Sequence, residues 1–205
     1  ERGASYLRIY RHAVLESGQN AGNQREGFAP VMNYGEIKYC DIANGTGVRT
    51  SVFVSGCRNR CEDCFNAATW NFDYGKPFAK EVEDEVIKSL QPSYIKGLSV
   101  LGGEPFEPEN QRGVLELIRR VKSETQGKTV WIYSGFTYEE LLSSSRAALP
   151  TAREILSAAD ILVDGRYDKN LRNISLAFRG SENQRIIDLR KTAEKGEVVL
   201  AKEYY

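Results

Sequence analysis

The sequence predicts an α/β fold, in the form of a shortened, partly open (βα) barrel with parallel strands. Short apolar runs rich in β-branched residues indicate strands buried on both faces, and amphipathic helical patterns lie between them. Strands that alternate with helices are typical of βαβ units and a parallel sheet. Periodicity alone does not separate an open doubly wound sheet from a partial barrel. A full eight-stranded barrel takes about 250 residues, whereas 174 residues follow from Met32 onward.

Each element follows from a local pattern. The predicted central strands are 52–54, 98–101, 130–133 and 161–163, and weaker predictions fall on 176–178 and 185–189. Two helices are predicted from apolar residues on one face, namely Val82, Val86, Ile87 and Leu90, and then Val114, Leu117, Ile118 and Val121. Two capping-box spacings predict later helix starts: Thr137 with Glu140, and Thr151 with Glu154.

The composition bounds the class of protein. Lysine plus arginine and aspartate plus glutamate both number 28, so the formal net charge is zero. A neutral chain has no broad attraction to nucleic acid or to an anionic membrane. No apolar run approaches the roughly 20 residues that span a bilayer, and no apolar signal segment is present. We therefore expect a cytoplasmic protein with no nucleic-acid partner and no membrane partner.

The chain divides into three parts. Residues 1–31 are polar and lack a hydrophobic period, so we expect a leader that is disordered or was added to the natural chain. Met32, the only methionine, then begins the functional domain over 32–190. Residues 191–205 are expected to form a charged C-terminal tail.

Three cysteines, Cys57, Cys61 and Cys64, form a C-x3-C-x2-C spacing. Three thiolates can hold three irons of a [4Fe–4S] cluster and leave the fourth iron without a protein ligand, whereas a cluster capped by four cysteines mostly carries electrons. A structural zinc site needs four ligands, and only Cys40 and the sole histidine, His12, could add one. The spacing favours the cluster, with zinc as the alternative. Cys40 is interpreted as a small hydrophobe in an apolar stretch.

Special residues follow each predicted strand. The cysteines follow the first strand, residues 102–105 the second, Ser134 the third and Asp164 the fourth. The carboxyl ends of parallel strands lie at one edge, where α/β folds build their sites. Gly102 and Gly103 let backbone approach a ligand without a Cβ in the way.

The same turn also holds a carboxylate. Pro105 biases Glu104 to an extended conformation, and the carboxylate suits an ammonium group. A simple turn is the alternative interpretation. For Asp164 a hairpin turn and a ligand contact are equally favoured. The aromatic residues at 70, 72 and 74 are predicted to form a lid over the cluster.

At this point the motifs resemble a known family. The cysteine spacing together with Gly102-Gly103-Glu104-Pro105 resembles the radical S-adenosylmethionine enzymes. The runs at 32–34, 41–49, 53–57, 64–66, 69–70, 163–167 and 179–185 are more closely similar to the activating proteins of anaerobic ribonucleoside-triphosphate reductases. The resemblance extends from Met32 to about Arg190.

The resemblance implies cofactors and site residues. Cys57, Cys61 and Cys64 would ligate a [4Fe–4S] cluster, and S-adenosylmethionine would chelate its open iron. The turn at 102–105 would orient the methionine end. The remaining implied cofactor contacts are Asp63, Cys64, Phe65, Ser134 and Asp164. Asp63 departs from the superfamily pattern, which often has an aromatic residue there, and Phe65 would supply that contact instead.

The resemblance also implies a reaction and partners. A one-electron donor such as flavodoxin or ferredoxin would reduce the cluster, and a 5′-deoxyadenosyl radical would generate a glycyl radical on the large catalytic subunit of the reductase. A homodimer or a mixed complex with the reductase is compatible with this. Competing hypotheses are the activase of another glycyl-radical enzyme such as pyruvate formate-lyase, a small-molecule radical enzyme, and a zinc-binding module without catalysis.

Overall fold

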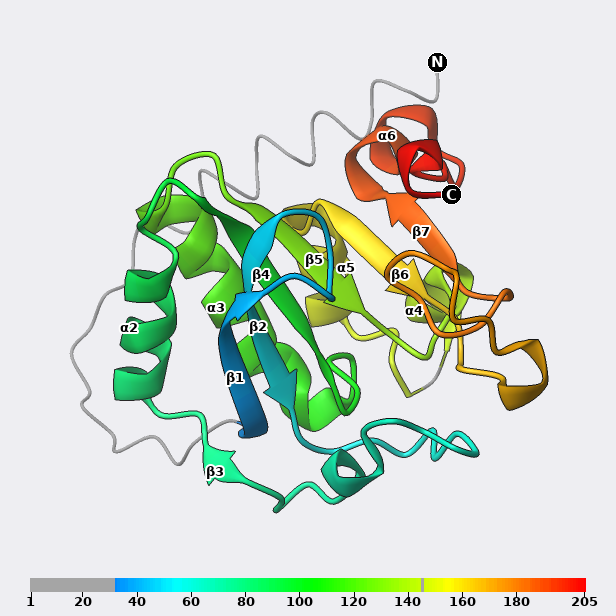
Figure 1. The fold of residues 1–205 in the computed structure, drawn as a ribbon, viewed down its shortest axis with the longest axis horizontal. Helices are drawn as coiled ribbons and strands as arrows, with labels where there is room; N and C mark the ends of the chain where they lie inside the picture. Colours follow the sequence, from blue (N-terminus) through cyan, green and yellow to red (C-terminus); the bar gives the residue numbers. More distant parts are fainter. Residues whose placement is uncertain (1–31, 145) are drawn as a thin grey trace.

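The computed structural model describes residues 32–144 and 146–205, so the predicted leader lies outside the described residues (Figure 1). The strands are β1 (Asn33–Asp41), β2 (Val48–Val54), β3 (Lys76–Pro77), β4 (Ile95–Gly102), β5 (Thr129–Tyr133), β6 (Ile161–Asp164) and β7 (Arg185–Asp188). The helices are α2 (Lys80–Ser89), α3 (Pro108–Glu124), α4 (Tyr138–Ser143), α5 (Pro150–Ala158) and α6 (Leu189–Lys195). Short 3-10 turns are η2 (Ala67–Trp70), η3 (Lys169–Leu171) and η4 (Lys202–Tyr204).

The described residues form one seven-stranded mixed sheet in the order β3-β1-β2-β4-β5-β6-β7. The four predicted central strands are confirmed, and β2, β4, β5 and β6 run parallel. The prediction of parallel strands is wrong for β1, β3 and β7, which pair antiparallel. A parallel neighbour needs a crossover of a dozen or more residues, usually a helix. The short connection 42–47 between β1 and β2 is too brief for one. The sheet is open, with β3 and β7 outermost, and a partial barrel is not confirmed.

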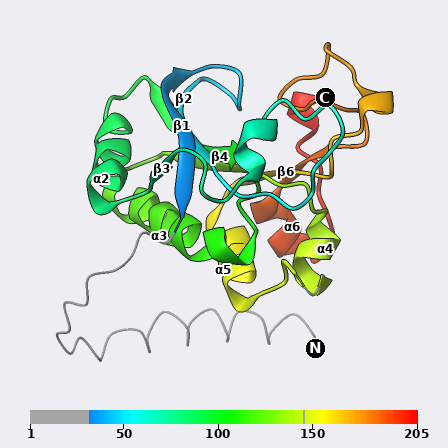
Figure 2. The same cartoon turned by 90° about the horizontal axis from the view of Figure 1, so that it is seen from below.

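The two faces of the sheet are covered differently. Side chains alternate along a strand, so neighbouring residues of β2 face opposite sides. Val52 and Val54 lie in the main hydrophobic core with the apolar faces of α2, α3 and α5. Figure 2 shows α3 and α5 on one side of the strands, and the chain after β2 on the other side. Phe53, the residue between the two valines, lines a cavity on that second side.

Helix starts confirm one capping prediction and correct the other. The amide of Glu140 donates to Thr137 Oγ1 at 3.2 Å and the amide of Thr137 donates to Glu140 Oε2 at 2.9 Å, which is the predicted capping box of α4. The box predicted at Thr151 is wrong, because α5 begins at Pro150 with Leu149 as its N-cap. Proline at the first helical position has a fixed φ and no N–H to satisfy, so it sets this helix start.

Three further expectations change in the folded chain. The segment 176–178 is not a strand: Phe178 has a φ of +57° and its ring lies 5.3 Å from that of Trp131. Cys40 is exposed rather than packed as a hydrophobe, because it lies on β1 near the edge of the sheet. The segment expected as a tail packs on the domain, with Ala201 fully buried and the ring of Tyr204 5.1 Å from Trp131.

Across residues 32–144 and 146–205, every helix is too short or too polar to cross a membrane.

Candidate cluster and cofactor site

The cysteine loop, the segment that contains Cys57, Cys61 and Cys64, begins where β2 ends. Gly56 has a φ of +94°, and a Cβ there would lie 2.2 Å from the ring of Phe72, so a larger residue would not fit. The amide of Gly56 donates to the carbonyl of Thr69 at 2.7 Å, and the amide of Cys57 donates to the carbonyl of Trp70 at 3.1 Å. The start of the cysteine loop is therefore hydrogen-bonded to residues 69–70, where the chain comes back beside it.

The three cysteine side chains lie around one cavity. Cys57 is buried, Cys61 and Cys64 are half-buried, and all three line a cavity of about 590 Å³. Burial, with a smaller contribution from the charge of Glu104, raises the pKa of Cys57 to about 11. Burial and then the charge of Cys64 raise the pKa of Cys61. A metal ion that binds these thiols must displace their protons.

The cavity suits a multi-iron cluster together with a small cofactor. Its volume lies within the range of ordinary ligand sites, about 300–1,000 Å³. Its floor is formed by strand residues, namely Phe53, Leu101, Tyr133 and Val163, and its cover by residues such as Leu176, Phe178 and Arg179. Among the described residues, no three His, Cys, Asp or Glu side chains converge as in a mononuclear metal site. A [4Fe–4S] cluster binds each thiolate to a different iron, so three thiols that line one cavity fit this group.

The turn after β4 lies directly against the cysteine loop. The amide of Gly103 donates to the carbonyl of Val54 at 2.7 Å, and the amide of Glu104 donates to the carbonyl of Gly56 at 2.9 Å. A Cβ on Gly103 would lie 2.6 Å from that Gly56 oxygen. The backbone at Gly103 therefore lies close to the cysteine loop, and the approach of a ligand to the glycine pair stays a prediction.

Glu104 is a buried carboxylate with all its contacts made by neutral donors. Oε1 accepts from the amide of Phe106 at 3.0 Å and from Ser134 Oγ at 2.9 Å. Oε2 accepts from the amide of Gly135 at 2.7 Å and from Asn59 Nδ2 at 3.0 Å. Burial raises the pKa of Glu104 to about 7. Its role as partner of an ammonium group stays a prediction.

The remaining predicted contacts divide into two groups. Those that line the cavity are Cys64, Phe65, Gly102, Gly103, Glu104 and Ser134. Asp63, Pro105 and Asp164 lie outside that lining. The Asp164 carboxylate accepts from the amide of Tyr138 at 2.7 Å and pairs with Arg185 at 2.5 Å, so it holds the fold at this strand end. Of the predicted lid aromatics, Trp70 lines the cavity.

Comparison with known proteins identifies the family. A family model described as "4Fe-4S single cluster domain" matches residues 43–187. The activating protein of anaerobic ribonucleoside-triphosphate reductase from Escherichia coli (strain K12) is 37% identical over 161 residues, 78% of this chain and 100% of that protein. The chain belongs to this family of activating proteins. The Vibrio cholerae member is 40% identical over 155 residues, covering 75% of this chain and 96% of its own. The member from Enterobacteria phage T4 is 37% identical over 155 residues, covering 76% and 93%.

Membership among the activating proteins resolves the choice of metal. The matched range includes the cysteine loop and the ends of all four parallel strands. The family description assigns a [4Fe–4S] cluster, and this replaces the zinc alternative that the cysteine spacing left open.

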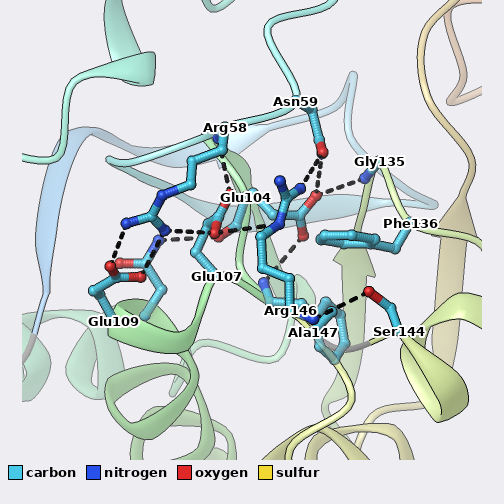
Figure 3. Close-up of polar contacts among 12 residues, drawn as sticks. Arg58, Asn59, Glu104, Glu107, Glu109, Gly135, Phe136, Ser144, Arg146 and Ala147 are labelled. Carbon is cyan, nitrogen blue, oxygen red and sulfur yellow. Dashed lines mark hydrogen bonds and ion pairs between the residues drawn. The ribbon is translucent and has the colours of Figure 1, made fainter.

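Sequence reasoning missed three polar residues beside the cluster loop of this activating protein. Glu107 is a second buried carboxylate; it accepts from the amide and from Nη1 of Arg58, both at 2.8 Å, and lies 3.6 Å from Arg146 Nε (Figure 3). Asn59 bridges Glu104 and Arg146. The proximity of Glu107 to the glycine-rich turn was an available signal. No local pattern indicates Arg146, whose contacts come from distant sequence.

Proposed function

We propose that this chain activates an anaerobic ribonucleoside-triphosphate reductase by reductive cleavage of S-adenosylmethionine at a [4Fe–4S] cluster held by Cys57, Cys61 and Cys64. One observation carries the proposal: the three cysteines and the Gly102–Gly103 backbone line the same cavity. When bound, the reduced cluster and S-adenosylmethionine supply a 5′-deoxyadenosyl radical that takes a hydrogen atom from one glycine of the large reductase subunit.

The chain's own residues bind, orient and exclude water. The apolar floor, including Phe53, Leu101 and Val163, limits water in the cavity. The polar residues at the strand ends that line the cavity, Ser134 among them, are our candidates to contact the methionine end of the cofactor. Phe65 is 73% exposed beside the cavity and is our candidate for the adenine contact. Asp63 and Asp164 lie outside the lining, so their contact with the cofactor is the least supported part of the proposal.

The proposal extends to partners and location. A cavity with one exposed aromatic residue at its rim suits a protein substrate, and an open sheet curved into a partial barrel would leave room for it. The electron donor is of the flavodoxin or ferredoxin type, the assembly is a homodimer or a mixed complex with the reductase, and the site of action is the cytoplasm.

The test is an anaerobic reaction followed by electron paramagnetic resonance. The iron-loaded protein, a reductant and S-adenosylmethionine are mixed with the anaerobic reductase or with the pyruvate formate-lyase of the same organism. A glycyl doublet on the reductase supports the proposal. A doublet on the lyase alone would reassign the substrate, and failure to form 5′-deoxyadenosine with either would refute the chemistry.

A further inference from the structure

Asn59 lies in the cysteine loop between two predicted iron ligands, and its amide contacts two other parts of the chain. Nδ2 donates to Glu104 Oε2 at 3.0 Å, in the turn after β4. Oδ1 accepts from Arg146 Nη2 at 2.5 Å, in the connection between α4 and α5. Figure 3 shows the Asn59 side chain above the Glu104 carboxylate and the Arg146 guanidinium.

The two partners fix which way the amide points. A guanidinium can only donate hydrogen bonds, because it has no acceptor atom. The amide oxygen of Asn59 must therefore face Arg146, and the amide nitrogen must face Glu104. Gly135 closes the third side: a Cβ at that position would lie 2.4 Å from Asn59 Nδ2. The side chain is thus held in one orientation by three separate segments.

Arg146 is itself held in place. Its guanidinium lies 4.6 Å from the ring centre of Phe136, and its Nε lies 3.6 Å from the buried carboxylate of Glu107. Glu107 also accepts two hydrogen bonds from Arg58, the neighbour of Asn59. Arg58 and Asn59 therefore contact the buried carboxylates of Glu107 and Glu104. Arg146 lies beside both contacts.

We propose that Asn59 is a positioning residue that fixes the cysteine loop against the turn after β4, and that Arg146 holds Asn59 in the required orientation. The cluster ligands lie on the loop and the proposed S-adenosylmethionine contacts lie on the turn, so their separation sets where the cofactor meets the cluster. The statement about the cofactor and the cluster rests on the proposed function. Because the cysteines themselves are untouched, loss of the bridge leaves iron binding intact and impairs the fit of the cofactor.

The test uses an isosteric variant. Asn59→Asp keeps an acceptor for Arg146 but places a carboxylate against Glu104. Arg146→Gln removes the cation, Arg146→Lys keeps it, and Arg119→Gln is the matched control, since Arg119 forms an exposed ion pair with Glu154 between α3 and α5. Each iron-loaded protein is assayed for iron and sulfide, for kcat and KM of S-adenosylmethionine, and for the change that this cofactor causes in the spectrum of the reduced cluster.

We expect all four variants to carry iron at the level of the unaltered protein. For Asn59→Asp, KM for S-adenosylmethionine rises about tenfold or more, since the hydrogen bond from Asn59 to Glu104 is lost and a second carboxyl group is placed beside it. The spectral change on cofactor addition weakens in parallel. Arg146→Lys falls between the unaltered protein and Arg146→Gln. Asn59→Asp combined with Arg146→Gln is worse than either alone, because Arg146 is the cation that faces the carboxylate introduced at position 59.

Hydrogen exchange gives a readout that needs no cofactor. The amides of Gly103 and Glu104 donate across the junction between the turn and the cysteine loop. In Asn59→Asp they should exchange about tenfold faster, whereas Arg119→Gln should leave them unchanged. Unchanged exchange with unchanged KM would overturn the positioning role. Faster exchange in a protein that never cleaves S-adenosylmethionine would support the bridge and refute the proposed function instead.

Discussion

At each end of the parallel strands one charged side chain is buried among neutral hydrogen-bonding groups, Arg49 at the amino end and Glu104 at the carboxyl end. At the amino end, Arg49 is fully buried. It donates from Nε to Ser99 Oγ at 2.8 Å, and from Nη2 to the carbonyls of Leu98 at 2.7 Å and Thr129 at 2.8 Å. Burial lowers the pKa of Arg49 to about 10, so it remains a cation at neutral pH.

At the carboxyl end, Glu104 is held by hydrogen-bond donors, including the amides of Phe106 and Gly135. Among the described residues, neither Arg49 nor Glu104 forms an ion pair within 4.0 Å. Carbonyl groups are the natural partners of a buried cation, and amides near a helix start are the natural partners of an anion. Glu104 lines the cavity and Arg49 does not, so a buried charge supports a site at the carboxyl end and the stability of the sheet at the amino end.

The largest effect should come from the cluster ligands at the carboxyl end. Cys57→Ala, Cys61→Ala or Cys64→Ala should each abolish cleavage of S-adenosylmethionine, because two thiolates hold the cluster poorly. Cys40→Ala, on an exposed thiol of β1, is the control and should keep its iron. Iron analysis and 5′-deoxyadenosine formation measure both. Loss of iron from Cys40→Ala alone would mean that the ligand assignment is wrong.

Gly103→Val tests the junction between the loop and the turn. The Cβ would press on the Gly56 carbonyl, so the cysteine loop shifts and most of the iron is lost, not the cofactor affinity alone. Gly127→Ala is the control: its φ of +67° costs about 1 kcal/mol, but a Cβ there meets open space. Measurements of iron content and of thermal unfolding distinguish Gly103→Val from Gly127→Ala. A Gly103→Val protein with full iron content would contradict this geometry.

Arg49→Met tests the amino end. The change removes the Arg49 donors from the carbonyls of Leu98 in β4 and Thr129 in β5, and we expect the free energy of unfolding to fall by about 3–5 kcal/mol. Denaturant unfolding of the iron-loaded protein, kept anaerobic, measures this. At low temperature, where Arg49→Met remains folded, this variant should still bind iron. A loss below about 1 kcal/mol would show that water donates to those carbonyls in place of Arg49.

The smallest effect is a pH dependence from Glu104. Its pKa of about 7 in the folded chain is above its ordinary 4.5, so folding favours the protonated form. The associated stability is fully present below about pH 4.5 and is lost as the pH rises through 7. The iron-free protein should therefore be about 2 kcal/mol more stable near pH 5.5 than near pH 8. Glu104→Gln should remove that difference; an equal difference in the variant would assign it to other groups.

Local patterns predicted much of this fold because the spacing of apolar residues along the chain indicates which side chains are buried. The central strands and the faces of α2 and α3 are where apolar periodicity placed them. The cysteine spacing indicated a cluster with no reference to shape. No apolar pattern within a segment predicts the pairing of β1, the antiparallel direction of β7 or the packing of Ala201.

The sequence by itself determined the central strands, the chemistry of the thiols and the edge at which the special residues meet. Tertiary structure alone decided which of those residues contact one another. Asn59 meets Glu104 across 45 positions and Arg146 across 87. Such pairs depend on how whole elements pack, because a single side chain specifies its own need for a partner but not the distant segment that supplies it.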